Sequence, residues 1–280
     1  MLAVLSLAFD PVFHLSDTAS VRLETIGLAI VLFVALLLAA RAATTSPAGG
    51  LRLDDLVFML VGAVPGAIIG GRTGYVLDHL DYYRANPTAM FDPAQGSLTL
   101  TLAVPLGILT GSIIARLLGA PIARWMQALA LPMLFTLAAG KLVGVFGASG
   151  QGAPADLSWA TAYAGAGPWG SLAAEVPSHP SQVYEAMLVA LAVAVMALAS
   201  RSRLIAHGNG AALFLALGLW AVARFVAAFT WRDPLAVGPL RMDQALLVGV
   251  LAIALVGLVQ RARYRVPITI DTQPAEEPQP

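Results

Sequence analysis

The sequence predicts an all-α, polytopic membrane protein with about seven transmembrane helices. Hydrophobic residues make up 58% of the 280 residues, charged residues make up 11%, and the mean hydropathy is +0.79. A soluble domain usually carries about twice that share of charged residues. Apolar runs close to the roughly 20 residues that a helix needs to cross a bilayer recur along the chain. These observations together exclude an ordinary soluble domain.

Seven apolar runs define the spans that we expect. In chain order they cover residues 24–43, 55–79, 98–118, 125–147, 182–200, 210–230 and 243–260. The chain up to residue 265 is expected to form a single transmembrane domain, 1–265. Its longest loop, about 148–181, contains no Lys or Arg and is expected to form a small external cap. The remaining segment, 266–280, is polar and rich in proline and is expected to be a disordered tail.

Glycines recur every four residues in the second span, and shorter versions of this pattern occur in the third and fourth spans. The glycines are Gly62, Gly66, Gly70 and Gly74, then Gly107 and Gly111, then Gly140 and Gly144. This spacing leaves a helix face without side chains, so that a neighbouring backbone can approach closely. Arg72, Tyr75 and His79 lie at i, i+3 and i+7 on a different face of the second span. Arg72 could therefore reach a cavity while the helix packs through its glycines.

The distribution of arginines predicts the orientation of the chain. With the N-terminus outside, nine arginines lie in inner segments, namely Arg41, Arg52, Arg116, Arg124, Arg201, Arg203, Arg261, Arg263 and Arg265. Four lie in outer segments, namely Arg22, Arg84, Arg232 and Arg241. The positive-inside rule therefore favours an N-terminus outside and a C-terminus inside.

Three cations lie inside the expected spans: Arg72, Lys141 and Arg224. A cation near the middle of a span costs a few kcal/mol, so each needs a partner or a function. Each lies six or seven residues from the outer end of its span. At about 1.5 Å per residue, this is roughly 9–11 Å below the outer boundary. Glu185 lies at a similar depth on the fifth span, and Gln182 and Tyr184 belong to the same polar layer.

Two interpretations of this layer remain open. Long cationic side chains can extend to the lipid headgroups and have no further role. Alternatively, three cations at one depth form a site for an anion, and in the outer leaflet the expected anion is a phospholipid phosphate. Glu185 would then belong to the site or serve as a structural counter-ion.

Several other classes of site are not expected. The formal net charge is zero, so nothing indicates nucleic-acid binding. The chain contains no cysteine, which excludes disulfides, thiolate nucleophiles and thiolate metal sites. We expect neither a metal site nor a cofactor. A secondary transporter is a weaker alternative, because we find no internal repeat and the charges cluster near one face rather than at the midplane.

Four stretches resemble the prolipoprotein diacylglyceryl transferase family over nearly the whole chain. They are Phe9-Asp10-Pro11-Val12, GGRTGYV (70–76), HPSQVYE (179–185) and RMDQALL (241–247). The resemblance implies transfer of the diacylglyceryl group of phosphatidylglycerol to the lipobox cysteine of a preprolipoprotein, which binds through its signal peptide. It also implies a multi-pass protein of the bacterial plasma (inner) membrane, in contact with the lipid bilayer.

The sequence departs from the family where the family's catalytic groups are expected. The His-Gly-Gly stretch of the third span is TLTLAVPLG (99–107) here and contains no histidine. Lys141 stands in place of an arginine, Gly144 in place of an asparagine, and Ser149 near a lost glutamate. Arg224 matches the family's arginine of the sixth span, but Ala228 replaces the acid one turn later. A lysine is a point charge and does not offer the two-pronged hydrogen bonding of an arginine.

Two hypotheses follow for the site. In the first, the chain is an active transferase. Its catalytic residues are then His179, Lys141 and Arg224, and its substrate-binding residues are Arg72, Tyr75, Gln182, Tyr184 and Glu185. His179 or His79 would replace the missing base, although His179 could equally be a helix-start residue that hydrogen-bonds through its backbone. In the second, the chain is a non-catalytic relative that binds lipid or lipoprotein without transfer.

Overall fold

The computed structural model describes residues 4–45, 50–92, 95–165, 167–200, 205 and 209–263. Within this part of the chain, seven helices are long and apolar enough to cross a membrane, which confirms the predicted all-α, polytopic fold. They are α1 (Leu23–Thr44), α2 (Leu53–Asp78), α4 (Leu100–Leu117), α5 (Ile122–Val143), α6 (Ser181–Ala199), α7 (Ala211–Ala227) and α8 (Met242–Arg263). The short turns η2 (Gly144–Gly147) and η4 (Ala228–Thr230) extend α5 and α7. The predicted tail and three of the arginines used to assign the orientation (Arg201, Arg203 and Arg265) lie outside the described residues.

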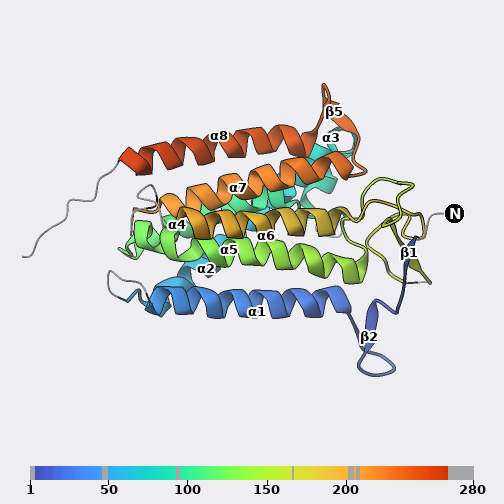
Figure 1. Ribbon diagram of the computed structural model, residues 1–280, viewed down its shortest axis with the longest axis horizontal. Coiled ribbons are helices and arrows are strands. Elements are labelled where there is room, and N and C mark those ends of the chain that lie inside the picture. The colour runs from blue at the N-terminus through green and yellow to red at the C-terminus, as the bar shows by residue number, and fades with distance from the viewer. Residues whose placement is uncertain are drawn as a thin grey trace, which may run out of the picture.

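The seven helices run side by side along the long axis of the molecule (Figure 1). α7 is the central helix, since 56% of its apolar window is buried, compared with 11% for α1. Trp220 and Leu217 of α7 are buried in a cluster with side chains of α5, α6 and α8. A central helix exposes little of its surface to lipid, so a charged residue on α7 has to find its partners inside the protein.

The glycine face of α2 packs against α4, as the spacing predicts. A Cβ atom at Gly66 or Gly70 would collide with the carbonyl oxygens of Leu106 and Leu102 on α4. Glycine is therefore the residue that allows the two backbones to come this close, and any side chain at these positions would push the helices apart.

One end of the bundle is covered by strands, turns and loops. β1 (Leu5–Ala8) pairs in parallel with β4 (Thr161–Ala164), which joins the N-terminal segment to the long loop after α5. We call β1 together with residues 148–180 the end cap. The same end carries the hairpins of β2 (Val12–His14) with β3 (Ser20–Arg22) and of β5 (Leu235–Val237) with β6 (Leu240–Arg241), and also α3 (Leu80–Ala85) and η1 (Pro87–Phe91). α8 ends at the opposite end of the bundle (Figure 1).

Buried polar side chains hold the end cap together. Gln151 Nε2 donates to the carbonyl oxygen of Thr161 at 3.0 Å. Arg232 follows α7 in the chain and reaches into the cap, where Nε donates to the Gly152 carbonyl oxygen at 2.6 Å and Nη2 donates to Ser178 Oγ at 2.8 Å. The cap is therefore fixed to the end of α7. That this end faces outward remains a prediction from the arginines.

Candidate functional site

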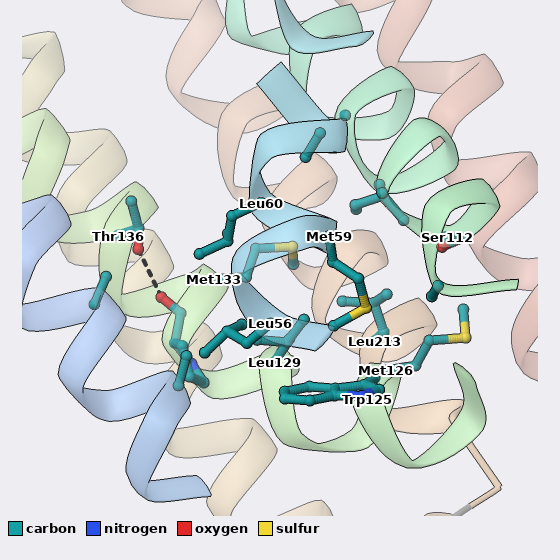
Figure 2. Close-up of a pocket in the computed structure, with 18 of the residues that line it drawn as sticks. Leu56, Met59, Leu60, Ser112, Trp125, Met126, Leu129, Met133, Thr136 and Leu213 are labelled. Carbon is teal, nitrogen blue, oxygen red and sulfur yellow. Dashed lines mark hydrogen bonds between the residues drawn. The ribbon is translucent and has the colours of Figure 1, made fainter. Parts of the chain in front are cut away.

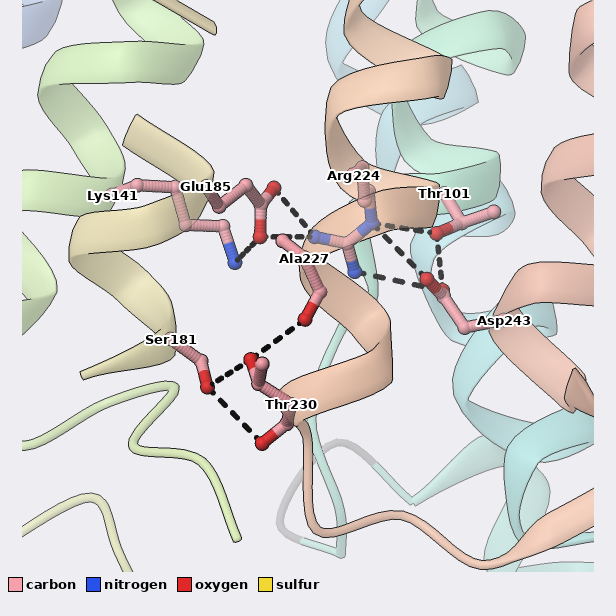
Figure 3. A network of polar contacts seen from close by, with 8 residues as sticks. All are labelled: Thr101, Lys141, Ser181, Glu185, Arg224, Ala227, Thr230 and Asp243. Carbon is pink, nitrogen blue, oxygen red and sulfur yellow. Dashed lines mark hydrogen bonds and ion pairs between the residues drawn. The ribbon is translucent and has the colours of Figure 1, made fainter. Parts of the chain in front are cut away.

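Arg224 lies in the last turn of α7, near the end cap, and is buried. Its guanidinium contacts three other helices (Figure 3). Nη1 donates to Glu185 Oε1 at 2.9 Å and to Oε2 at 3.3 Å. Nε donates to Thr101 Oγ1 at 2.9 Å and lies 3.2 Å from Asp243 Oδ2. Nε, Nη1 and Nη2 of the guanidinium each have an oxygen acceptor within 3.5 Å, as a buried arginine requires.

Glu185, near the start of α6, holds two cations at once. Its Oε2 lies 2.9 Å from Lys141 Nζ, and its Oε1 accepts the hydrogen bond from Arg224. The Glu185 side chain is 1% exposed and that of Lys141 is 20% exposed. The structure therefore joins the sequence-predicted residues Lys141, Glu185 and Arg224 into one group, with the carboxylate between the cations.

Asp243 and Thr101 complete the group. Asp243 lies in the first turn of α8, where a carboxylate also suits the positive end of the helix dipole. Thr101, near the start of α4, donates its hydroxyl to Asp243 Oδ1, which also lies 3.5 Å from Arg224 Nη2. We call Thr101, Lys141, Glu185, Arg224 and Asp243 the charge cluster; it connects α4, α5, α6, α7 and α8. Its two cations and two carboxylates give a formal charge of zero.

Trp231, just after η4, packs over both cations of the cluster. Its ring centroid lies 4.4 Å from the guanidinium carbon of Arg224 and 5.5 Å from Lys141 Nζ. The face of an indole ring attracts cations, so Trp231 stabilises both charges. Nearby, Ser181 Oγ lies 2.6 Å from Thr230 Oγ1, which ties the start of α6 to the end of α7 (Figure 3).

Arg72 is held elsewhere. Its Nε donates to the Met90 carbonyl oxygen at 2.8 Å, and Nη2 donates to the Ala89 carbonyl oxygen at 2.6 Å. The guanidinium also lies over the ring of Tyr83, 5.4 Å from its centroid. These contacts fix the loop between α3 and α4, so the three cations expected in one layer separate into a pair and a single residue with backbone partners.

Tyr75 lies beside Arg72 at the end of α2, close to His79. Its ring stacks on His79 with 4.2 Å between centroids, and His79 Nδ1 lies 3.0 Å from the Tyr75 carbonyl oxygen. His79 is exposed at the tip of α2. The structure therefore places Arg72, Tyr75 and His79 in one group around the loop that follows α2.

His179, Gln182 and Tyr184 lie where the end cap meets α6. His179 exchanges backbone hydrogen bonds with Ala153 and Gly152, and its Nδ1 atom is buried without a hydrogen-bond partner in the described part of the chain. Tyr184 accepts a hydrogen bond from Trp159 Nε1 at 2.6 Å. The backbone bonds of His179 match its interpretation as a helix-start residue.

Gln182 is buried and donates through Nε2 to the hydroxyl of Tyr163 at 3.1 Å. Tyr163 belongs to β4 in the end cap. Burial raises the pKa of the Tyr163 hydroxyl to about 12, so it is protonated at neutral pH. Gln182 thus connects α6 to the cap through an uncharged hydrogen bond.

An apolar cavity of about 470 Å³ lies between the helices (Figure 2). Its lining residues belong mainly to the half of the bundle away from the end cap. Side chains of α1, α2, α4 and α5 form its walls, and Leu213 of α7 also lines it. Trp125 lies at one end of the cavity and Thr136 lies on its α5 wall. Leu32, Leu36 and Leu60, which line the cavity, are exposed in the structure.

Asp243, Thr101 and Trp231 were not identified from the sequence. An aspartate in the first turn of a helix is common because of the helix dipole, so Asp243 did not stand out as Glu185 did. Thr101 lies in the stretch 99–107, where a histidine was expected, and a threonine near a helix start is not by itself a sign of a site. The sequence did contain a signal for both residues, because Thr101 and Asp243 are polar residues just inside the expected spans 98–118 and 243–260.

Comparisons with known proteins agree on one family. The family model for prolipoprotein diacylglyceryl transferase matches residues 11–260. The chain is 29% identical over 268 residues to a phosphatidylglycerol–prolipoprotein diacylglyceryl transferase of Geobacter sulfurreducens, covering 92% of this chain and 97% of that protein. A protein of the same name from Pseudomonas paraeruginosa is 33% identical over 211 residues, covering 70% of this chain and 72% of the relative.

Proposed function

The chain belongs to the prolipoprotein diacylglyceryl transferase family, and we propose that it transfers the diacylglyceryl group of phosphatidylglycerol to the cysteine thiol of a prolipoprotein. It is a multi-pass bacterial membrane protein. In our proposal the protein lies in the inner membrane, and the acceptor cysteine lies next to the signal peptide of the preprolipoprotein. The chain has no cysteine, and none is needed because the nucleophile belongs to the substrate protein.

The reaction requires stabilisation of a leaving phosphate. A thiolate attacks the glycerol carbon that carries the phosphate, and the bond from that carbon to the phosphate oxygen breaks. Negative charge then accumulates on the leaving phosphate, and a fixed cation in a site of low dielectric constant stabilises it more than water would. A member of this family therefore needs a positioned cation at the depth of the lipid headgroup.

The observation that carries the proposal is the position of Arg224. It lies in the last turn of the central helix, 5% exposed, with its guanidinium held by Glu185 at 2.9 Å. Lys141 shares this carboxylate, so both cations are positioned before any substrate binds. In our proposal the lipid phosphate binds Arg224 and Lys141, and Glu185 keeps the two cations together. Trp231 covers their other side.

The remaining predicted residues have proposed roles at the borders of this site. His179 and Tyr184 lie between the end cap and α6, where an acceptor polypeptide could approach from the cap side. Gln182 supports the same border through Tyr163. In our proposal Arg72 and Tyr75 hold the loop after α2 in place and also contact the substrate.

We also propose that the apolar cavity takes up a hydrocarbon chain of a membrane lipid. Its volume of about 470 Å³ is within the usual range of ligand pockets. Its walls are almost entirely apolar, and Leu36 and Leu60, which line it, are exposed; in our proposal the cavity opens toward lipid beside them. An apolar cavity that is open to a bilayer offers lipid tails van der Waals contacts like those that they make with each other.

Expression in cells depleted of their own transferase tests the function. We expect a reporter prolipoprotein to gain one diacylglyceryl group, measured by intact-protein mass spectrometry, and a reporter with serine in place of its cysteine to remain unmodified. Arg224→Lys should lower modification by at least ~100-fold, because a lysine cannot reach both Glu185 and Thr101. Arg116→Lys makes the same substitution at the exposed far end of α4 and should leave modification unchanged.

An unmodified reporter, together with wild-type protein that is stably inserted, would contradict the proposal. That result would leave the non-catalytic alternative, a membrane protein that binds lipid or lipoprotein without transferring a group.

A further inference from the structure

The two carboxylates of the charge cluster are held unequally. Glu185 contacts both cations, with 2.9 Å to Arg224 Nη1 and 2.9 Å to Lys141 Nζ. Of the two cations in the charge cluster, Asp243 contacts Arg224, with 3.2 Å and 3.5 Å between the nearest atoms, and it also accepts a hydrogen bond from the Thr101 hydroxyl. In the described part of the chain, Asp243 Oδ2 is buried and accepts no hydrogen bond. Asp243 is therefore the carboxylate that Arg224 can release at the lower cost.

Binding of a phosphodiester requires such a release. The cluster is formally neutral, so one added anion would leave a net negative charge in a buried site, which is costly. The N–H groups of Arg224 are already occupied by Glu185 and Asp243. A phosphate can therefore bind Arg224 only if one of these carboxylates moves away from it. Once Arg224 has turned toward a phosphate, Asp243 is a buried carboxylate without a cation, and accepting a proton removes that uncompensated charge.

We propose that Asp243 is the proton acceptor for the substrate thiol, and that the lipid phosphate takes the place of Asp243 on Arg224. This inference rests on the proposed transferase function. It assigns the missing base to α8, a helix that carries no histidine, and not to His179 or His79. It also orders the reaction, because Asp243 becomes available as a base only after the lipid has bound.

The thiol S–H bond breaks and its proton goes to Asp243 Oδ2. The sulfur electron pair forms a bond to the glycerol carbon of the lipid. The bond from that carbon to the phosphate oxygen breaks, and its electron pair leaves with glycerol phosphate. The product phosphate carries one more negative charge than the phosphodiester did, and Asp243 carries one fewer. The total charge next to Arg224 and Lys141 is therefore unchanged.

The groups that face Asp243 come from five other helices. They are Arg224 of α7 and the Thr101 hydroxyl of α4 in direct contact, and Lys141 of α5, Glu185 of α6 and Asp78 at the end of α2 at longer range.

The pH dependence of Asp243→Asn tests the inference in purified protein with phosphatidylglycerol and a lipobox peptide. A general base contributes about 10²–10⁴-fold, so we expect kcat at pH 7 to fall at least ~100-fold. The peptide thiol ionises unaided as the pH approaches its pKa of about 8.5. The kcat of the variant should therefore rise about tenfold per pH unit below that value, while the wild type changes less. KM for phosphatidylglycerol should not rise, because asparagine does not compete for Arg224.

Asp54→Asn is the matched control, because Asp54 occupies the first turn of α2 at the opposite end of the bundle and is exposed. It should behave as the wild type at every pH. If Asp243→Asn does not insert stably, Asp243→Ser replaces it, since it also lacks a carboxylate and is expected to show the same slope.

Two outcomes would overturn the inference while leaving the proposed function intact. In one, the wild type transfers and the variant keeps its rate within a few-fold. In the other, the variant loses the same factor at every pH, which indicates a structural role for Asp243. Absence of transfer by the wild type would instead contradict the proposed function itself.

Discussion

Glu185 is the residue of the charge cluster that contacts both cations. It separates two cations that would otherwise repel each other, and its side chain is 1% exposed. Removal of one partner from a buried ion pair leaves the other charges without compensation, and this usually costs more than the pair itself contributes. The stability of the ends of α5, α6 and α7 that lie next to the end cap should therefore depend on this carboxylate.

Glu185→Gln should lower the free energy of unfolding by about 3–5 kcal/mol, because Lys141 and Arg224 both lose their shared counter-ion. Glu175→Gln, the same substitution at an exposed position of the end cap, should have little effect. Thermal unfolding in detergent, followed by the fraction of monodisperse protein that remains after heating, measures both. Equal stability of the two variants would contradict the buried role of Glu185.

Sequence reasoning identified Lys141, Glu185 and Arg224 because charged residues inside apolar spans are conspicuous. It grouped Arg72 with them because depth along a helix can be counted from the sequence. Depth does not say which way a side chain turns about the helix axis, and the Arg72 guanidinium turns toward Met90 and Ala89. Asp243 escaped notice because its position at a helix start has an ordinary electrostatic explanation.

At the level of elements, the contact of α2 with α4 depends on missing side chains. Gly70→Ala would place a Cβ atom against the Leu102 carbonyl, which cannot move without shifting α4. Overpacking of this kind costs about 1–3 kcal/mol, so we expect the variant to unfold at lower temperature than the wild type. The same thermal assay measures it.

Gly249→Ala is the matched control for Gly70→Ala. A Cβ atom at Gly249 on α8 would meet open space, and alanine is favoured over glycine in a helix by up to about 1 kcal/mol. The control should be unchanged or slightly more stable. A Gly70→Ala variant as stable as the Gly249→Ala variant would show that α2 and α4 are less tightly packed than in the structure.

The apolar cavity makes a prediction at the same scale. Ser112→Phe places a large ring into the cavity from α4, whereas Ile113→Phe changes a neighbouring side chain that faces outward and is 49% exposed. We expect Ser112→Phe to reduce the amount of phospholipid that co-purifies with the protein, measured by lipid mass spectrometry, and Ile113→Phe to have no effect. Equal lipid content in both variants would show that the cavity does not hold a hydrocarbon chain.

The seven spans could be predicted from the sequence because each is a long apolar run. The short elements at the cap end could not. The pairing of β1 with β4 joins residues that are more than 150 positions apart in the chain, and the strands have only four residues each. So short a strand carries too little periodicity to be recognised, and its partner is set by how the helices bring the two segments together.

At the scale of the whole molecule, the orientation is a prediction that the absence of cysteine makes easy to test. A single cysteine introduced by Ser158→Cys lies on the end cap, and one introduced by Thr45→Cys lies at the other end of α1. With the N-terminus outside, a membrane-impermeant maleimide should label intact cells at position 158 only. Labelling at position 45 should require permeabilised cells, and the reverse pattern would mean that the chain is inverted.

The release of glycerol phosphate by the purified protein in phosphatidylglycerol vesicles is the sharpest test of the proposed transfer reaction. We expect one glycerol phosphate for each lipobox peptide that gains a diacylglyceryl group, with no release in the absence of peptide or when serine replaces its cysteine. Arg224→Lys should abolish the release, while Arg116→Lys should preserve it. The account would be contradicted if folded wild-type protein in these vesicles released no glycerol phosphate in the presence of the peptide.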